Sequence, residues 1–118
     1  MNVKQFYIDT KGDYNDALRR MMNDALIVRM IAKFITGDSI NGLISSYENK
    51  DFRAVFSSAH TLKGVAGNLS LTPLFEIASR ITEATRNDDG VNLDEEIAEL
   101  KETYVSIKEA YKKYLAVI

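Results

Sequence analysis

The regular spacing of apolar residues near the carboxyl end constrains the fold of this chain more than any other feature. From residue 93 onward, large apolar or aromatic residues recur at intervals of four and three: Leu93, Ile97, Leu100, Tyr104, Ile107, Tyr111 and Tyr114. This spacing matches the α-helical period, so these side chains share one face of a single helix. Three earlier segments show the same period, and the chain contains one proline and six glycines. The sequence therefore predicts an all-α fold.

Four long helices are expected, separated by short polar segments. The first begins at Asn23 or Asp24, is kinked or broken by the letters TGDS at residues 36–39, and continues to about Tyr47. The other three are expected to cover residues 52–68, 73–86 and 93–114.

Residues that favour helix starts precede three of these segments. Asp51 and Thr72 are good N-cap residues, and Pro73 suits the first helical position. Asn92, with Glu95 three residues later, has the pattern of a capping box. These caps support the expected boundaries.

The short connections between the predicted helices determine the expected architecture. Connections of about two to six residues place consecutive helices antiparallel to each other. We therefore expect an antiparallel four-helix bundle with one short additional helix at the amino end, which carries Tyr14, Leu18, Met21 and Met22. Residues 1–12 are expected to be a lead-in, and residues 1–118 to form a single domain.

Composition excludes several function classes. The chain has 118 residues, is 46% hydrophobic and 27% charged, carries a net charge of −2 at pH 7 and contains no cysteine. Such a chain has no basic footprint for nucleic acid, no disulfides and no thiolate metal site. It has no apolar run near 18 residues and no signal-peptide pattern. We expect a cytoplasmic protein that binds neither nucleic acid nor membrane, and the initiating Met1 favours a stand-alone protein.

The segment AHTLKGVAGNL, residues 59–69, contains His60, the only histidine of the chain. At about 100° per residue, His60 lies about 130° from the centre of the apolar sector of its helix, so it should face solvent. That sector consists of Phe52, Val55, Phe56, Ala59, Leu62, Ala66 and Leu69.

Two glycines, Gly64 and Gly67, share the strip of His60 together with Arg53 and Ser57. Each glycine costs about 1 kcal/mol of helix stability relative to alanine. Helical side chains lean toward the amino terminus, so the residue at i+4 would normally cover the histidine. We therefore expect both glycines to provide steric clearance around an uncovered imidazole.

An exposed histidine beside a lysine suits phosphoryl transfer. Neutral imidazole is a good nucleophile near pH 7. Phosphoryl transfer requires mostly positioning and charge stabilisation from the protein. Lys63, three residues after His60, lies within reach of a group on the imidazole and can act as a point charge for phosphoryl oxygens.

The segment closely resembles the motif of histidine-containing phosphotransfer (HPt) domains of two-component phosphorelays. The resemblance rests on the His-x-x-Lys-Gly core at His60, Lys63 and Gly64, placed on the second long helix of a four-helix bundle. It implies that His60 is phosphorylated and exchanges a phosphoryl group with aspartates of response-regulator receiver domains. It also implies a carrier without a nucleotide site or cofactor, with Mg²⁺ on the receiver.

Two departures from the HPt pattern concern the turn after this helix and the following helix. Ser70 stands where the family usually has glycine. On the following helix the family often offers a longer polar side chain toward the histidine, and the matching offsets here give Thr82 and Arg86. Arg53, Ser57, Thr82 and Arg86 are therefore possible docking or supporting residues. Met21 and Met22 are expected in the core, with a possible part in receiver docking.

Other interpretations remain. In one of them, an associated histidine kinase phosphorylates His60 directly, and in another the bundle is a purely structural interaction module. A hybrid histidine kinase is a further candidate partner beside the receiver domains. A metal site is not expected, because one histidine and no cysteine supply few ligands. A calcium loop over residues 85–96 would begin with Thr85 where an aspartate is required. The self-contained bundle favours a monomer.

Overall fold

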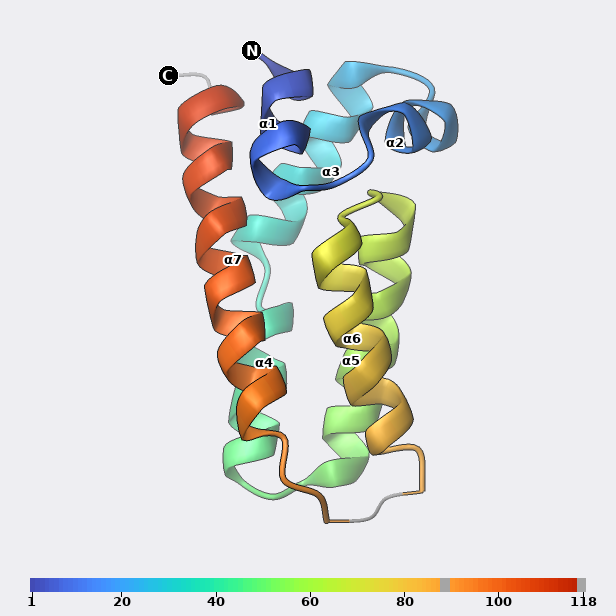
Figure 1. Cartoon of the computed structure of the whole chain (residues 1–118), viewed down its shortest axis with the longest axis vertical. Coiled ribbons are helices and arrows are strands. Elements are labelled where there is room, and N and C mark those ends of the chain that lie inside the picture. The colour runs from blue at the N-terminus through green and yellow to red at the C-terminus, as the bar shows by residue number, and fades with distance from the viewer. Residues whose placement is uncertain (88–89, 117–118) are drawn as a thin grey trace.

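Seven α-helices form the part of the chain that the computed structural model describes, residues 1–87 and 90–116. They are α1 (Val3–Thr10), α2 (Tyr14–Met21), α3 (Asp24–Thr36), α4 (Ser39–Glu48), α5 (Phe52–Asn68), α6 (Thr72–Ala84) and α7 (Asp94–Tyr114). Figure 1 shows α5, α6 and α7 running along the long axis of the molecule, with α1 and α2 at one end. The predicted all-α fold is confirmed, and no strand occurs in the described residues.

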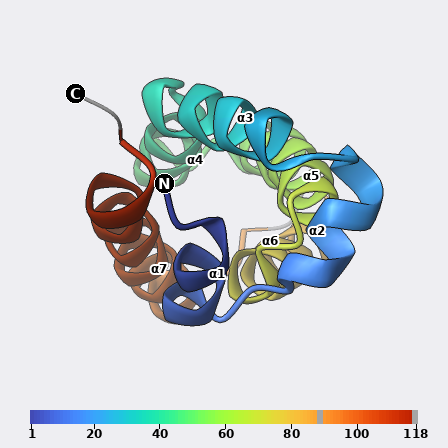
Figure 2. The same cartoon turned by 90° about the horizontal axis from the view of Figure 1, so that it is seen from above.

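Four helical columns form the bundle: α3 with α4, then α5, α6 and α7. Each column runs antiparallel to the next along the chain (Figure 1), and the view from above shows the columns arranged around a common core (Figure 2). One residue from each of the helices α3 to α7 is at least 99% buried: Ile31, Leu43, Leu62, Ile81 and Leu100. Burial of such apolar surface is the main stabilising term of a bundle.

The apolar residues that are spaced by four and three from Leu93 onward form the buried face of α7. Leu93, at its N-cap, and Ile97, Leu100, Tyr104 and Ile107 are buried, and the two later tyrosines are half-buried. The hydroxyl of Tyr104 donates a hydrogen bond to the main-chain oxygen of Ile35 across the core, at 3.1 Å. A polar group at the rim of the core is thereby satisfied.

The predicted interruption of the first long segment is a complete break. Helix α3 ends at Thr36, and α4 begins at Ser39. The main-chain N–H of Gly37 donates to the main-chain oxygens of Lys33 and Phe34, which closes the last turn of α3. The apolar stripe then resumes with Ile40 and Leu43, so both helices cover the same core.

Most of the lead-in predicted for residues 1–12 forms a helix, α1, which was not predicted from the sequence. Phe6 and Tyr7 are almost completely buried, and the Tyr7 hydroxyl donates to the main-chain oxygen of Leu69 at 2.6 Å. Asn2 caps the helix by accepting from the N–H of Gln5. The bundle therefore has two additional helices at its amino end where the sequence predicted one. The sequence missed α1 because eight residues contain too few turns to establish a period.

Two of the three predicted caps also need correction. Asp51 accepts from the N–H of Ala54, as expected. Thr72 is instead the first residue of α6, with Leu71 at the N-cap. Asn92 lies one residue before the N-cap of α7, and its side chain accepts from the N–H of Asp94 at 2.9 Å. Helix α6 ends at Ala84, two residues before the predicted end.

Candidate functional site

His60 lies near the middle of α5 and is exposed. Arg53, Ser57 and Gly64 are exposed on the same strip. On the opposite side of α5, the small and aliphatic residues Val55, Ala59, Leu62 and Ala66 are buried in the bundle core. His60 therefore lies on the solvent side of its helix, as the helical period predicts.

The imidazole of His60 is stacked on the ring of Phe56, one turn earlier on α5. The ring centroids are 6.0 Å apart, and the planes differ by only 5°. This is an offset-parallel arrangement, and it follows from the lean of helical side chains toward the amino terminus. Sequence reasoning assigned Phe56 only to the core, but its ring is half-buried and reaches the histidine. Within residues 1–87 and 90–116, neither ring nitrogen of His60 makes a hydrogen bond.

The two glycines of the strip have different surroundings. A Cβ atom placed on Gly64 would meet nothing within 4 Å. A Cβ atom on Gly67 would lie 3.4 Å from the ring of Phe75 on α6. Gly64 thus leaves open surface beside His60, whereas Gly67 lies against an aromatic ring of the neighbouring helix.

Lys63 extends from α5 toward α6. Its Nζ lies 5.8 Å from the centroid of the Phe75 ring, a cation–π contact. Phe75 itself is 37% exposed. The ammonium group therefore lies beside the histidine strip, over the seam between the two helices.

Arg86, just after the end of α6, joins the same surface. Its guanidinium donates to both carboxylate oxygens of Glu83, at 3.2 Å and 2.6 Å. These hydrogen bonds, and then the Arg86 charge and more weakly the Lys63 charge, lower the pKa of the Glu83 carboxyl. The Cζ atom of Arg86 also lies 5.7 Å from the centroid of the Phe56 ring. One aromatic ring thus contacts both the imidazole and a guanidinium.

Thr82, which was proposed together with Arg86 as a supporting residue, does not fit a contact with a docked partner. It is completely buried, and its hydroxyl donates to the main-chain oxygen of Ala78 at 2.7 Å. A threonine inside a helix commonly forms such a bond to the carbonyl four residues earlier. Its hydroxyl is therefore turned into α6 rather than toward His60.

The first position of the calcium interpretation of residues 85–96 is Thr85, whose side chain is turned into α6. The hydroxyl of Thr85 is buried and donates to the main-chain oxygen of Ile81 at 2.8 Å. Asp89, a further candidate ligand in that loop, lies outside the described residues.

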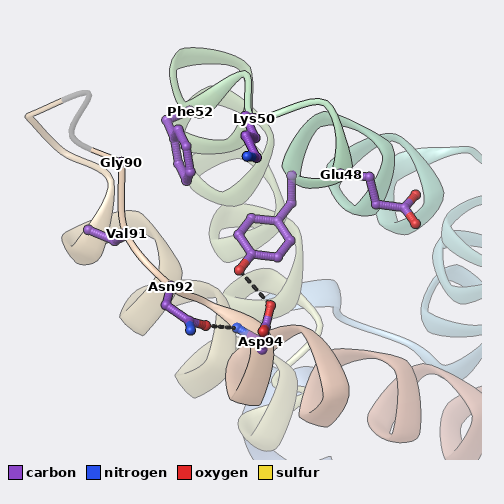
Figure 3. A pocket seen from close by; sticks show the side chains of 8 residues that line it. Glu48, Lys50, Phe52, Gly90, Val91, Asn92 and Asp94 are labelled. Carbon is purple, nitrogen blue, oxygen red and sulfur yellow. Dashed lines mark hydrogen bonds between the residues drawn. The ribbon is translucent and has the colours of Figure 1, made fainter.

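Two larger pockets lie away from the imidazole. One of about 510 Å³ lies between the α4–α5 turn and the start of α7 (Figure 3), where the Tyr47 hydroxyl donates to Asp94. It contains none of the predicted site residues. The other, an apolar groove of about 490 Å³, is lined from α2, α3 and α5 by residues that include Met21, Met30 and Val65.

A family model for the Hpt domain matches residues 15–110. The chain belongs to the Hpt domain family. Neither a curated protein nor a solved structure matches it. Hpt domains are histidine phosphotransfer modules of two-component signalling, and they act as phosphocarriers between kinases and receiver domains. The matched range contains α2 except its first residue, all of α3 to α6 and most of α7, together with the whole His60 surface, and leaves α1 outside. No helix among the described residues of this Hpt domain is both long and apolar enough to cross a membrane.

Proposed function

We propose that His60 accepts a phosphoryl group from the aspartyl phosphate of one receiver domain and passes it to the aspartate of another. The observation that carries this proposal is the exposure of the imidazole, with neither nitrogen hydrogen-bonded to the described residues, in a chain of the Hpt family. A nucleophile that must meet an aspartate inside a partner has to stand clear of its own surface, and Gly64 supplies open ground beside it.

The reaction is an exchange of one bond for another. The lone pair of the unprotonated ring nitrogen attacks phosphorus, an N–P bond forms, and the acyl-phosphate O–P bond breaks. The electron pair of that bond leaves with the receiver carboxylate, and the other ring nitrogen keeps its proton. The reverse sequence delivers the phosphoryl group to a second receiver, so no oxidant, nucleotide or hydrolytic water is needed.

We assign Lys63 and Arg86 to the electrostatic stabilisation of the phosphoryl group on this surface. Phosphoryl transfer depends on positioning and on neutralising the charge of the equatorial oxygens. Lys63 has a flexible stem and a compact charge, so it can turn from Phe75 toward a phosphoryl group on His60. We assign the metal of the reaction, Mg²⁺, to the receiver, which holds it beside its own aspartate.

A receiver needs a docking surface next to His60 as well as access to it. The apolar groove lined by Met21, Met30 and Val65 lies on the flank of α5 opposite to Phe56. Methionine side chains adapt to different partners. We propose that this groove contributes apolar contacts to docking, and that the polar residues Arg53 and Ser57 lie at the rim of the same contact.

The test follows radioactive phosphate through a panel of receiver domains. Each receiver is charged with labelled acetyl phosphate, freed of the donor and mixed with this protein or its His60→Gln variant. We expect acid-labile, base-stable label on the wild-type chain only, and its onward movement to a second, uncharged receiver. Label that requires a histidine kinase and ATP, and never comes from any receiver, would overturn the proposal in favour of direct phosphorylation. Label on the His60→Gln variant would overturn the site.

A further inference from the structure

We infer that Phe56 is a positioning residue: its ring holds the imidazole of His60 in the orientation needed for in-line attack on phosphorus. This inference rests on the proposed function, because it concerns how His60 performs the transfer. Its starting observation is the offset-parallel stack of the two rings, 6.0 Å apart and 5° from parallel.

An attacking imidazole must be aimed as well as exposed. The lone pair of the ring nitrogen has to point along the line of the breaking bond, and this direction depends on both side-chain torsions of the histidine. Proteins often fix such a ring through a hydrogen bond to its second nitrogen. In the described part of this chain, no such bond exists for His60. The orientation must come from another contact.

The neighbours of His60 along α5 leave Phe56 as that contact. Gly64, one turn later, has no side chain to press on the ring. Lys63 is engaged with Phe75 on the side toward α6. Among the residues that the structure describes, Phe56 is the one whose ring stacks parallel to the imidazole.

Phe56 is itself held more firmly than an exposed side chain would be. Its ring is half-buried, and the Arg86 guanidinium lies 5.7 Å from its centroid. Arg86 is in turn held by two hydrogen bonds to Glu83. The ring therefore gives the exposed imidazole a support that is anchored in α5 and contacted from the end of α6.

A stacked ring has a chemical advantage over a hydrogen bond at this position. It limits the torsions of the imidazole but occupies neither nitrogen. One nitrogen remains available for attack, and the other can keep its proton in the phosphorylated product. A carrier that runs in both directions needs this freedom on both halves of the reaction.

The experiment compares Phe56→Leu, Phe56→Tyr and Phe52→Leu. Phe52 is a matched control, because it is a half-buried phenylalanine on the same helix that packs edge-on against Tyr47, at 6.2 Å. Transfer to each variant is measured over a range of concentrations of the charged receiver that labels the wild-type protein fastest. Labelling by phosphoramidate is measured in parallel. In this reaction the P–N bond of the donor breaks, the N–P bond to the imidazole forms, and ammonia leaves. NMR spectra follow the ring-current shifts of the imidazole protons.

Loss of the stack should lower the maximal transfer rate of Phe56→Leu by roughly threefold to tenfold, the population change that corresponds to one aromatic pair. The half-saturating receiver concentration should stay the same, and phosphoramidate labelling should change less, because a small donor can approach several ring orientations. The ring-current shifts should disappear in Phe56→Leu and persist in Phe56→Tyr and Phe52→Leu, and both of these variants should transfer normally.

A maximal rate in folded Phe56→Leu within about twofold of the wild type would overturn the inference, since the expected loss is larger. An equal loss in Phe52→Leu, or a change in the half-saturating concentration alone, would also overturn it, because these outcomes indicate a fold or docking effect. These results leave wild-type transfer intact, so they do not touch the proposed function. Absence of label from wild-type His60 would instead overturn the proposed function, and this inference with it.

Discussion

Replacement of Gly64 by glutamine should raise stability while it blocks transfer. The position is in the interior of α5, and a Cβ atom there would meet nothing within 4 Å. Glutamine is a better helix former than glycine, by up to about 1 kcal/mol. For a domain of this size that gain corresponds to a rise in Tm of roughly 3–6 °C.

The same substitution should obstruct the phosphoryl donor. Helical side chains lean toward the amino terminus, so a side chain at position 64 lies over His60, one turn earlier. A donor held about 1 Å from its productive position can lose on the order of a hundredfold in rate. We therefore expect transfer from a charged receiver to fall at least that far in a protein that is more stable than the wild type.

Gly42 offers a matched control for this experiment. It lies inside α4, and an added Cβ atom there also meets nothing within 4 Å. Gly42→Gln should gain a similar amount of stability and keep the wild-type transfer rate. Thermal unfolding and transfer from one receiver should be measured for both variants. Normal transfer in a stable Gly64→Gln protein would refute the clearance argument and leave the glycine without a functional reason.

Three further outcomes are expected. His60→Gln should change the free energy of unfolding by no more than about 0.5 kcal/mol, because the side chain is exposed, and should abolish labelling; unfolding of this variant in thermal melts would contradict the assignment. Lys63→Ala should keep docking and lose less rate than Gly64→Gln, which receiver titrations would show; a larger loss would contradict the order. The hydrogen bond from Ser70, and then that from Arg20, lowers the pKa of the Asp16 carboxyl to about 2. The ionised Asp16 therefore stabilises the fold fully above about pH 4, and this stabilisation is lost as the pH falls toward 2. Ser70→Ala should therefore be destabilised relative to wild type at pH 6 but much less at pH 2 in denaturant titrations, and an equal difference at both values would count against this bond.

The α7 stripe and the exposed side of α5 could be predicted from sequence because both depend on a local period. Repeated spacing over many turns fixes which face of a helix is buried, and His60 then falls on the other face. Helix α1 could not be found in this way, since Phe6 and Tyr7 owe their burial to contacts with distant parts of the chain such as Leu69. Tertiary packing stabilises this helix, because a helix of this length has little stability by itself.

The contacts around the site were less predictable than its position. A wheel assigns Phe56 to the apolar sector, but whether its ring meets His60 depends on side-chain torsions that a wheel does not contain. The burial of Thr82 depends on how α6 is rotated against the core. Ser70 shows a third kind of long-range effect. It has φ of 51°, which favours glycine, and its hydroxyl donates to Asp16 in α2, 54 residues away in sequence.

The expected order of the losses in transfer rate depends on whether other groups can replace what each variant removes. The charge of Lys63 is one of several near the phosphoryl group, because Arg86 lies on the same surface and the receiver is proposed to bring Mg²⁺. The ammonium group of the lysine contacts Phe75 at the end of a flexible stem, so removing it costs charge but little geometry. The stack of Phe56 restricts a ring that can still sample the productive orientation without it. Bulk at position 64 is different, because no neighbour can move to restore the lost space. Geometry should therefore outweigh charge on this surface, with the largest rate loss at Gly64 and smaller losses at Phe56 and Lys63.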